Sequence, residues 1–140
     1  MEPNKSILIV DDEFAVRESL KMIFKPMYHV YTAANGEEAL RCIQREEIDL
    51  VTLDLKMPGL SGMEVLRQIK ENHPFIAAII ITAYGSGENA MEATRYGAEF
   101  ITKPFNVADI LISLNKALEK QSYNLKFKNF SLYNSLVVRN

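Results

Sequence analysis

The chain of 140 residues is poor in the residue types that form disulfides, zinc sites and membrane spans. Its one cysteine, Cys42, excludes an internal disulfide and is typical of a reducing, cytoplasmic setting. Its two histidines, His29 and His73, lack metal-ligand spacing to each other or to Cys42, so we do not expect zinc. No apolar run approaches the roughly 20 residues of a membrane span, and the N-terminus has no signal-peptide pattern. We therefore expect a cytoplasmic protein without a membrane segment.

Charge is distributed unevenly along the chain. Residues 121–140 carry a charge of +3 and no acid, so the total charge of −2 leaves −5 on residues 1–120. An acidic body argues against direct nucleic-acid binding by the main domain. The content of 48% hydrophobic and 24% charged residues is typical of a globular protein, and the length fits one domain.

Short apolar runs alternate with amphipathic segments five times. Because the runs are rich in β-branched residues, they predict strands of a parallel sheet that are buried on both faces. The predicted strands are residues 7–10, 29–33, 50–53, 79–81 and 100–102, and the predicted helices are residues 14–25, 37–45, 62–71, a weakly apolar segment around 90–94, and 107–120. Ser61 and Glu64 have the S-x-x-E spacing of a capping box. Five such units predict right-handed crossovers with helices on both faces of the sheet.

Polar residues follow four of the predicted strands. They are Asp11-Asp12, Asp54, Thr82 and Lys103-Pro104. In parallel sheets the chemistry lies beyond the carboxyl ends of the strands, so we expect these side chains to converge. Carboxylates, a hydroxyl and an ammonium in one crevice suit a divalent cation and a phosphoryl group.

Each of these residues also has a purely structural interpretation. We expect one of the acids at positions 11–13 to cap the following helix. Thr82 also suits the end of a strand, and an isolated Lys103 suits a solvated surface. Their joint occurrence at four strand ends favours a site. Because clustered carboxylates repel one another, we expect at least one acid with a raised pKa in the metal-free site.

The last twenty residues leave two structures open. A leucine every seven residues, at positions 111, 118, 125 and 132, favours an extension of the last helix into a dimerising seam, whereas residues 125–128 alternate like a strand. We divide the chain into a domain of residues 1–120 and a C-terminal tail or linker of residues 121–140.

Over residues 5–120 the chain resembles the receiver domains of two-component response regulators. The matching motifs are Ile7 to Glu13, Asp54 to Gly59, Gly62-Met63-Glu64, Thr82-Ala83 and Lys103-Pro104-Phe105. The resemblance implies a flavodoxin-like, doubly wound (βα)5 fold with a five-stranded parallel sheet in strand order 2-1-3-4-5. The amino-acid sequence at residues 58–59 and 82–85 is most similar to that of receivers of the nitrogen-regulation class.

The resemblance also implies a chemistry for the site. A sensor histidine kinase would phosphorylate Asp54 in the presence of Mg²⁺. The side chains of Asp12 and Asp54 and the backbone carbonyl of Lys56 would hold the ion, and Asp11 would act through water. Thr82 and Lys103-Pro104, a cis peptide, would contact the phosphoryl group.

Further expectations concern the output. Phosphorylation would change the rotamer of Phe100 and the surface of the fourth helix, fifth strand and fifth helix, which a partner or a second protomer reads. Lys56 and Tyr84 lie where the family tunes hydrolysis of the acyl phosphate. The resemblance implies a phosphoacceptor switch that assists only its own phosphorylation and dephosphorylation, and that regulates transcription within a parent protein.

Two alternatives use the same residues differently. A phosphohydrolase of the dehalogenase type would use Asp11 as nucleophile and Glu13 two residues later, but it leaves Asp54 unexplained. A binding-only pseudo-receiver usually lacks one of the acids or the lysine, and all of them are present here.

Overall fold

The computed structural model describes the backbone of residues 5–139 and the side chains of residues 5–130. Within them, strands and helices alternate as the sequence pattern predicts. The elements are β1 (Ser6–Val10), α1 (Phe14–Phe24), β2 (His29–Ala33), α2 (Gly36–Arg45), β3 (Leu50–Leu53), α3 (Gly62–Asn72), β4 (Ala77–Thr82), α4 (Gly87–Arg95), β5 (Glu99–Thr102) and α5 (Val107–Arg139).

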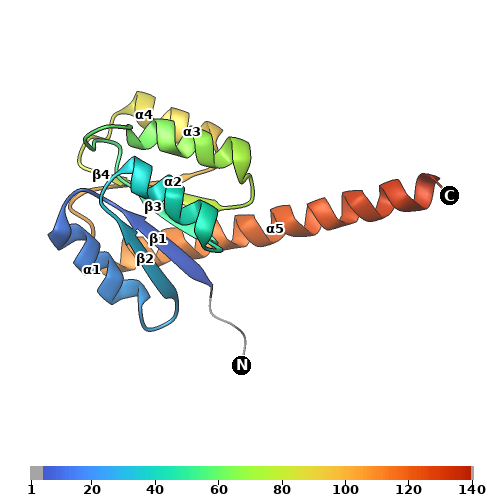
Figure 1. Cartoon of the computed structure of the whole chain (residues 1–140), viewed down its shortest axis with the longest axis horizontal. Coiled ribbons are helices and arrows are strands. Elements are labelled where there is room, and N and C mark those ends of the chain that lie inside the picture. Colours follow the sequence, from blue (N-terminus) through green and yellow to red (C-terminus); the bar gives the residue numbers. More distant parts are fainter. Residues whose placement is uncertain (1–4, 140) are drawn as a thin grey trace.

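The five strands form one parallel sheet in the order β2-β1-β3-β4-β5, which confirms the predicted topology (Figure 1). The register aligns the carboxyl ends of the strands. Val10 is paired with Leu53 across β1 and β3, and Thr82 is paired with Thr102 across β4 and β5. The residues that follow these strands therefore emerge at one edge of the sheet.

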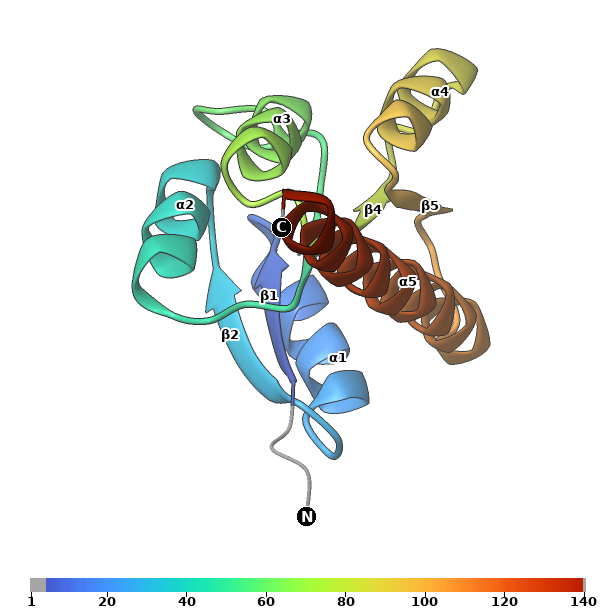
Figure 2. The same ribbon diagram turned by 90° about the vertical axis from the view of Figure 1, so that its right-hand side faces the viewer.

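Helices cover both faces of the sheet. Figure 2 shows α1 and α5 on one face and α2, α3 and α4 on the other. The central strands β1, β3 and β4 are almost entirely buried, and alternate residues enter two separate apolar clusters, one under each layer of helices. Cys42 of α2 lies half-buried against one cluster, as expected for a packed thiol.

Four of the five helices begin with side-chain caps, and at the start of α5 the Asn106 Oδ1 accepts a hydrogen bond from the Asp109 N–H at 2.8 Å. The side-chain oxygens of Asn35, Ser61 and Ser86 each accept a hydrogen bond from the backbone N–H three residues later. The capping box predicted at Ser61 is only half present. The carboxylate of Glu64 binds Arg67 on the next turn instead of returning to the backbone of Ser61.

Helix α5 continues well beyond the domain (Figure 1). Residues 121–139 are helical, so the strand-like alternative for residues 125–128 is wrong. Leu111 and Leu118 pack against the apolar cluster of the domain and are not free to form a seam. Leu125 is partly exposed, and the side chain of Leu132 lies outside the described residues. The division at residue 120 stays a prediction.

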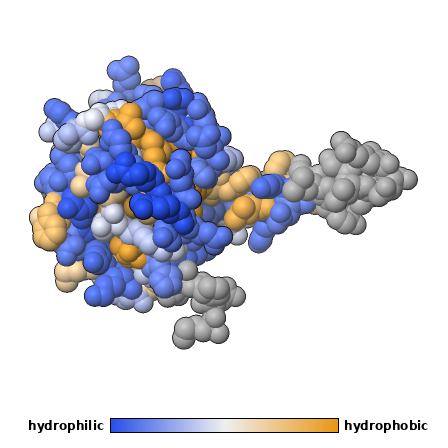
Figure 3. All heavy atoms as spheres, viewed as in Figure 1, coloured by the Kyte–Doolittle hydropathy of each residue, from blue (hydrophilic) through white to orange (hydrophobic). Residues whose placement is uncertain are grey.

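Gln121 fixes α5 where it leaves the domain. Its side chain is buried, and Nε2 donates to the backbone oxygens of Asp49 and Phe75 at 2.6 and 3.1 Å. Beyond it, Tyr123 and Phe127 are exposed, and Figure 3 shows apolar side chains on the surface of this part of α5. Among the described helices, none has the length and apolar composition needed to cross a membrane.

Candidate functional site

The side chains predicted to converge do lie together at the carboxyl edge of the sheet. Lys103 Nζ lies 2.8 Å from Asp11 Oδ2 and 3.1 Å from Asp54 Oδ2. A third acid, Glu13, places its Oε1 3.6 Å from the same ammonium. Residues separated by 92 and 49 positions in the sequence thus form one charged cluster.

Burial and pairing shift the pKa values in this cluster. Burial raises the pKa of Asp11 above its ordinary value, and hydrogen bonds from Lys103 and from the backbone of Glu13 oppose the rise only in part. The charge of Asp54 adds to the rise but is a minor cause. The prediction of an acid with a raised pKa is confirmed, although desolvation rather than repulsion is the main reason. Burial acts to lower the pKa of Lys103, but its bonds to Asp11 and Asp54 outweigh this effect and raise it.

Four acids form a cluster with the composition of a site for a hard cation. Asp11, Asp12, Glu13 and Asp54 each place one carboxylate oxygen within 4.8 Å of those of the others. Asp11 and Asp54 are buried, whereas Asp12 and Glu13 face solvent. An all-oxygen donor set with an open side suits Mg²⁺, which keeps several waters. Glu13 was not among the predicted ligands, although its position beside Asp11-Asp12 is the signal that could have indicated it.

Backbone contacts hold the loop after β1 in place. Asp11 Oδ1 accepts a hydrogen bond from the Glu13 N–H at 2.9 Å, and Arg17 Nη1 donates to the Asp11 carbonyl at 2.8 Å. Glu13 is the N-cap residue of α1, but its side chain makes no capping bond. The expectation that one of these acids caps α1 is therefore wrong. Asp11 instead closes a tight turn, which leaves its Oδ2 directed at Lys103.

Thr82 lies beside Lys103 at the ends of β4 and β5. The Lys103 N–H donates to the Thr82 carbonyl at 2.8 Å, which continues the pairing of the two strands. Thr82 is fully buried, and its Oγ1 accepts a hydrogen bond from the Tyr84 N–H at 3.1 Å. The predicted cis peptide between Lys103 and Pro104 is confirmed.

Asp54 borders a cavity of about 380 Å³ at this edge of the sheet. Asp12, Glu13, Lys56 and Tyr84 are among the residues that line it. Lys56 Nζ lies 4.5 Å from the centre of the Tyr84 ring, so the two side chains form a cation–π pair at the cavity. The Lys56 N–H approaches Asp54 Oδ1 at 3.4 Å, a long contact that leaves this oxygen weakly satisfied.

Gly62 supports the backbone that carries Asp54. A Cβ at position 62 would lie 2.0 Å from the Asp54 carbonyl oxygen, closer than any side chain permits. The Gly62 N–H also donates to the Leu55 carbonyl at 2.9 Å. The close approach of α3 to the end of β3 therefore requires glycine here.

Phe100 is half-buried in β5 and packs at the edge of the apolar cluster under α2 to α4. The loop that follows Thr82 lies close to it, because a Cβ at Gly85 would be 3.2 Å from Phe100 Cε1. The loop and the ring are therefore neighbours at this end of the sheet. The predicted role of Phe100 as a switch stays a prediction.

Comparison with known proteins agrees with this geometry. The sequence profile of the response regulator receiver domain matches residues 7–115. The chain is 40% identical to sporulation initiation phosphotransferase F of Bacillus subtilis over 85% of this chain and 98% of that protein. It is 36% identical to the transcriptional regulatory protein GlrR of Escherichia coli over 83% of this chain and 27% of that protein. A CheY-like receiver domain from Methanospirillum hungatei superposes with a TM-score of 0.81 at 35% identity, over 86% of this chain and 98% of that one.

These matches separate the alternatives. The profile covers more than half of the chain, and it includes all four strand ends that carry the site. In the dehalogenase-type reading Asp11 would be the nucleophile, yet both of its carboxylate oxygens are engaged, one by the Glu13 N–H and one by Lys103. Asp54, in contrast, has one weakly satisfied oxygen, and the residue lines an open cavity.

Proposed function

The chain belongs to the response regulator receiver domain family, and from this premise we propose that Asp54 accepts a phosphoryl group from the phosphohistidine of a sensor histidine kinase. One observation carries the proposal. Asp54 is buried, and Lys103 binds one of its oxygens, while the other has only the long contact to the Lys56 N–H. Asp54 also lines a cavity that has room for a phosphoryl group.

In this reaction Asp54 Oδ1 attacks phosphorus in line, the new O–P bond forms, and the N–P bond to the imidazole breaks with its electrons returning to the ring nitrogen. Lys103, 3.1 Å from Asp54 Oδ2, stabilises charge on the transferred group. Asp11, Asp12, Asp54 and the Lys56 carbonyl would hold Mg²⁺, with Glu13 nearby, and the ion would neutralise charge between carboxylate and phosphate.

The switch follows from Thr82 and Lys103, the two residues that would contact the new phosphoryl group. Thr82 Oγ1 now accepts from the Tyr84 N–H and keeps its own proton for a phosphoryl oxygen. When the Thr82 hydroxyl donates this proton to a phosphoryl oxygen, Thr82 moves toward the site. The loop after β4, which is bound to Thr82 through the Tyr84 N–H, moves with it beside Phe100. A phosphate interaction that favours the moved loop by about 3 kcal/mol shifts the two populations roughly 150-fold.

Intact-mass analysis tests the acceptor directly. Incubation with acetyl phosphate and Mg²⁺ should add one phosphoryl group to the wild-type chain and none to Asp54→Asn. Asp109→Asn is the matched control, because Asp109 is exposed and lies outside the acidic cluster, so this variant should be labelled like wild type. Labelling that survives in Asp54→Asn would place the acceptor elsewhere.

For the output, we propose that phosphorylation promotes a homodimer through α4, β5 and α5. Met91 of α4 and Ile112 of α5 expose apolar side chains, and Ile112 and Phe100 line a cavity of about 310 Å³ on this face. The dimer should appear in light scattering only after phosphorylation. Met91→Glu should prevent it without reducing the mass increase at Asp54, and a dimer that persists in this variant would exclude the face.

Two kinds of relative bear on the wider role. The chain spans 27% of the length of GlrR, so regulation of transcription by a parent protein is a proposal from that similarity. The 40% identity over 98% of a phosphotransferase favours a second candidate, in which phosphorylated Asp54 passes its group to a histidine of another protein. Transfer of label from the purified phosphoprotein to a histidine phosphotransfer protein would support the second role. In the first role the domain promotes only its own phosphorylation and dephosphorylation.

A further inference from the structure

A third cavity lies at the opposite, amino-terminal edge of the sheet. It has a volume of about 130 Å³ and is bounded by the end of α3, the start of β4, the end of α4 and the part of α5 around residue 120. Ala77 at the start of β4 lines it, and Thr82 ends the same strand five residues later, roughly 16 Å away. It therefore shares no residue with the phosphorylation site.

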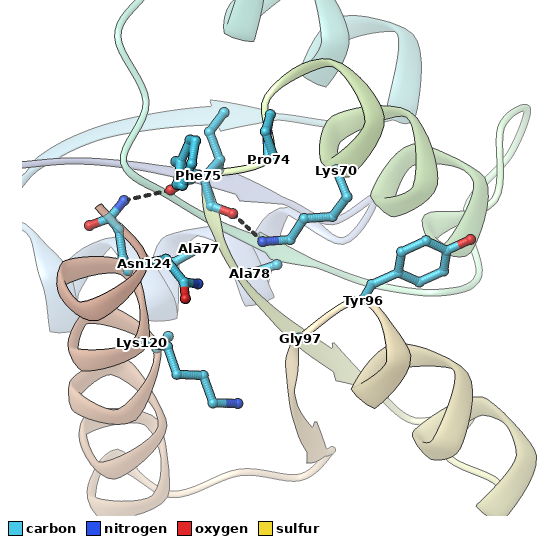
Figure 4. Close-up of a pocket in the computed structure, with 12 residues that line it drawn as sticks. Lys70, Pro74, Phe75, Ala77, Ala78, Tyr96, Gly97, Lys120 and Asn124 are labelled. Atoms are coloured by element: carbon cyan, nitrogen blue, oxygen red, sulfur yellow. Dashed lines mark hydrogen bonds between the residues drawn. The ribbon is translucent and has the colours of Figure 1, made fainter. Parts of the chain in front are cut away.

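Two lysines reach this cavity from different helices. Figure 4 shows Lys70 extending from α3 toward the start of β4, and Lys120 extending from α5. Lys70 Nζ donates to the Ile76 carbonyl at 2.5 Å. Lys120 Nζ is paired with Glu99 Oε2 at 2.6 Å, so its charge is already balanced.

The charge of Lys70 has no carboxylate to balance it. The ion pairs among the described side chains involve Arg67, Lys103 and Lys120, and none involves Lys70. Burial lowers the pKa of Lys70, and the nearby charge of Lys120 lowers it further. A half-buried ammonium bound only to a neutral carbonyl is an unfavourable arrangement that a bound anion would relieve.

The remaining lining supplies polar partners. Gln121 and Asn124 of α5 border the cavity beside Lys120. The Gln121 amide is already bound to two backbone carbonyls, so it forms a fixed wall, and the exposed Asn124 remains as a neutral hydrogen-bond donor. Ammonium and amide donors around a small cavity are the groups that recognise an oxyanion.

We propose that the cavity between Lys70 and Lys120 binds a small oxyanion, a phosphate or a carboxylate. The anion would bridge α3 to α5 at the point where α5 leaves the domain. It would also supply the negative charge that Lys70 lacks in the chain itself.

An NMR titration of the full chain without Mg²⁺ tests the site, because phosphate is then repelled from the acidic cluster. Inorganic phosphate and acetate, each compared with chloride at equal ionic strength, should cause saturable shifts in the amides of residues 76, 77, 97 and 121. The amides of residues 11–13 and 54 should not shift. The anion that binds more tightly identifies the ligand class.

Variants separate a built site from general attraction to lysines. Lys70→Gln should weaken binding about tenfold or more, because it removes a charge-assisted hydrogen bond. Lys116→Gln makes the same change at an exposed position of α5 and should have no effect. If Lys70→Gln does not fold, Lys120→Gln serves in its place. It removes the positive charge on the more exposed side of the cavity and should also weaken binding. Shifts that do not saturate, or that are equal in all variants, would overturn the proposal, and neither result depends on Asp54.

Discussion

Replacing Lys103 by methionine should destabilise the metal-free protein strongly. The Lys103 side chain is only 11% exposed and bridges two carboxylates that are 3% and 4% exposed, at 2.8 and 3.1 Å. Removing one partner of a buried ion pair leaves uncompensated charge and costs about 3 to 5 kcal/mol. We expect about 3 kcal/mol, the lower end, because the cluster opens to solvent at Asp12 and Glu13.

The loss of stability in Lys103→Met should be larger at high pH than at low pH. A raised pKa of Asp11 means that the folded protein holds this proton more tightly than the unfolded chain does. Stability therefore falls as pH rises from the ordinary pKa of the carboxyl through its value in the fold. Without Lys103 the pKa of Asp11 rises further, so Lys103→Met should lose more stability near about pH 7 than near about pH 5.

Urea unfolding followed by circular dichroism measures the effect, since the chain has no tryptophan for fluorescence. Lys116→Met is the control, because Lys116 is exposed, and it should change the free energy of unfolding by less than about 0.5 kcal/mol. Adding Asp11→Asn to Lys103→Met should recover part of the loss, and Mg²⁺ should do the same. A loss below about 1 kcal/mol for Lys103→Met would mean that the bridge behaves like a surface ion pair, and the reasoning would fail.

Three further predictions concern the neighbourhood of the site. Tyr84→Ala removes the ring that lies beside Lys56 at the cavity, so the acyl phosphate should hydrolyse several-fold faster in a phosphate-release assay, and an unchanged rate would exclude a shielding role. Gly62→Val places a side chain against the Asp54 carbonyl and should lower both stability and the rate of phosphorylation by acetyl phosphate, whereas a fully active variant would contradict the contact. Thr52→Val should stabilise the protein by about 1 kcal/mol in urea unfolding, because the Thr52 hydroxyl is the one buried polar side-chain group in the described part of the chain without a hydrogen-bond partner. A loss of stability would instead show that this hydroxyl has a partner.

Much of the fold was readable from local patterns. Runs such as residues 50–53 and 79–81 are buried on both faces. All of their positions are apolar or β-branched, with Thr52 as the one hydroxyl, and this distinguishes them from amphipathic helices. Ser61 marked the start of α3 because a hydroxyl there accepts the first free N–H groups of the helix. The second half of the capping box failed at Glu64, because Arg67 on the next turn offers a stronger, charged partner.

The site was predictable in composition but not in detail. Asp11, Asp54, Thr82 and Lys103 were expected at one edge because parallel strands present their carboxyl ends together, and the structure places them there. Glu13 was not predicted as a member of the acidic cluster. Its exposed side chain joins the cluster because the turn closed by Asp11 orients it, and a local sequence pattern does not show that turn. The length of α5 was left open, since residues 125–128 satisfy both a helical and an alternating pattern.

The sequence by itself determined which segments are strands and which strand ends carry charge, because both depend on residue type and spacing. Its motifs also resemble those of receiver domains, a resemblance that the family match over residues 7–115 confirms. The tertiary structure decided how those charges interact. Burial raised the pKa of Asp11, and Lys103 became the bridge between two acids far apart in the chain. The tertiary structure also created the cavity that Lys70 and Lys120 line. No local pattern indicates this cavity, because the two lysines come to it only when α3 and α5 pack against opposite faces of one sheet.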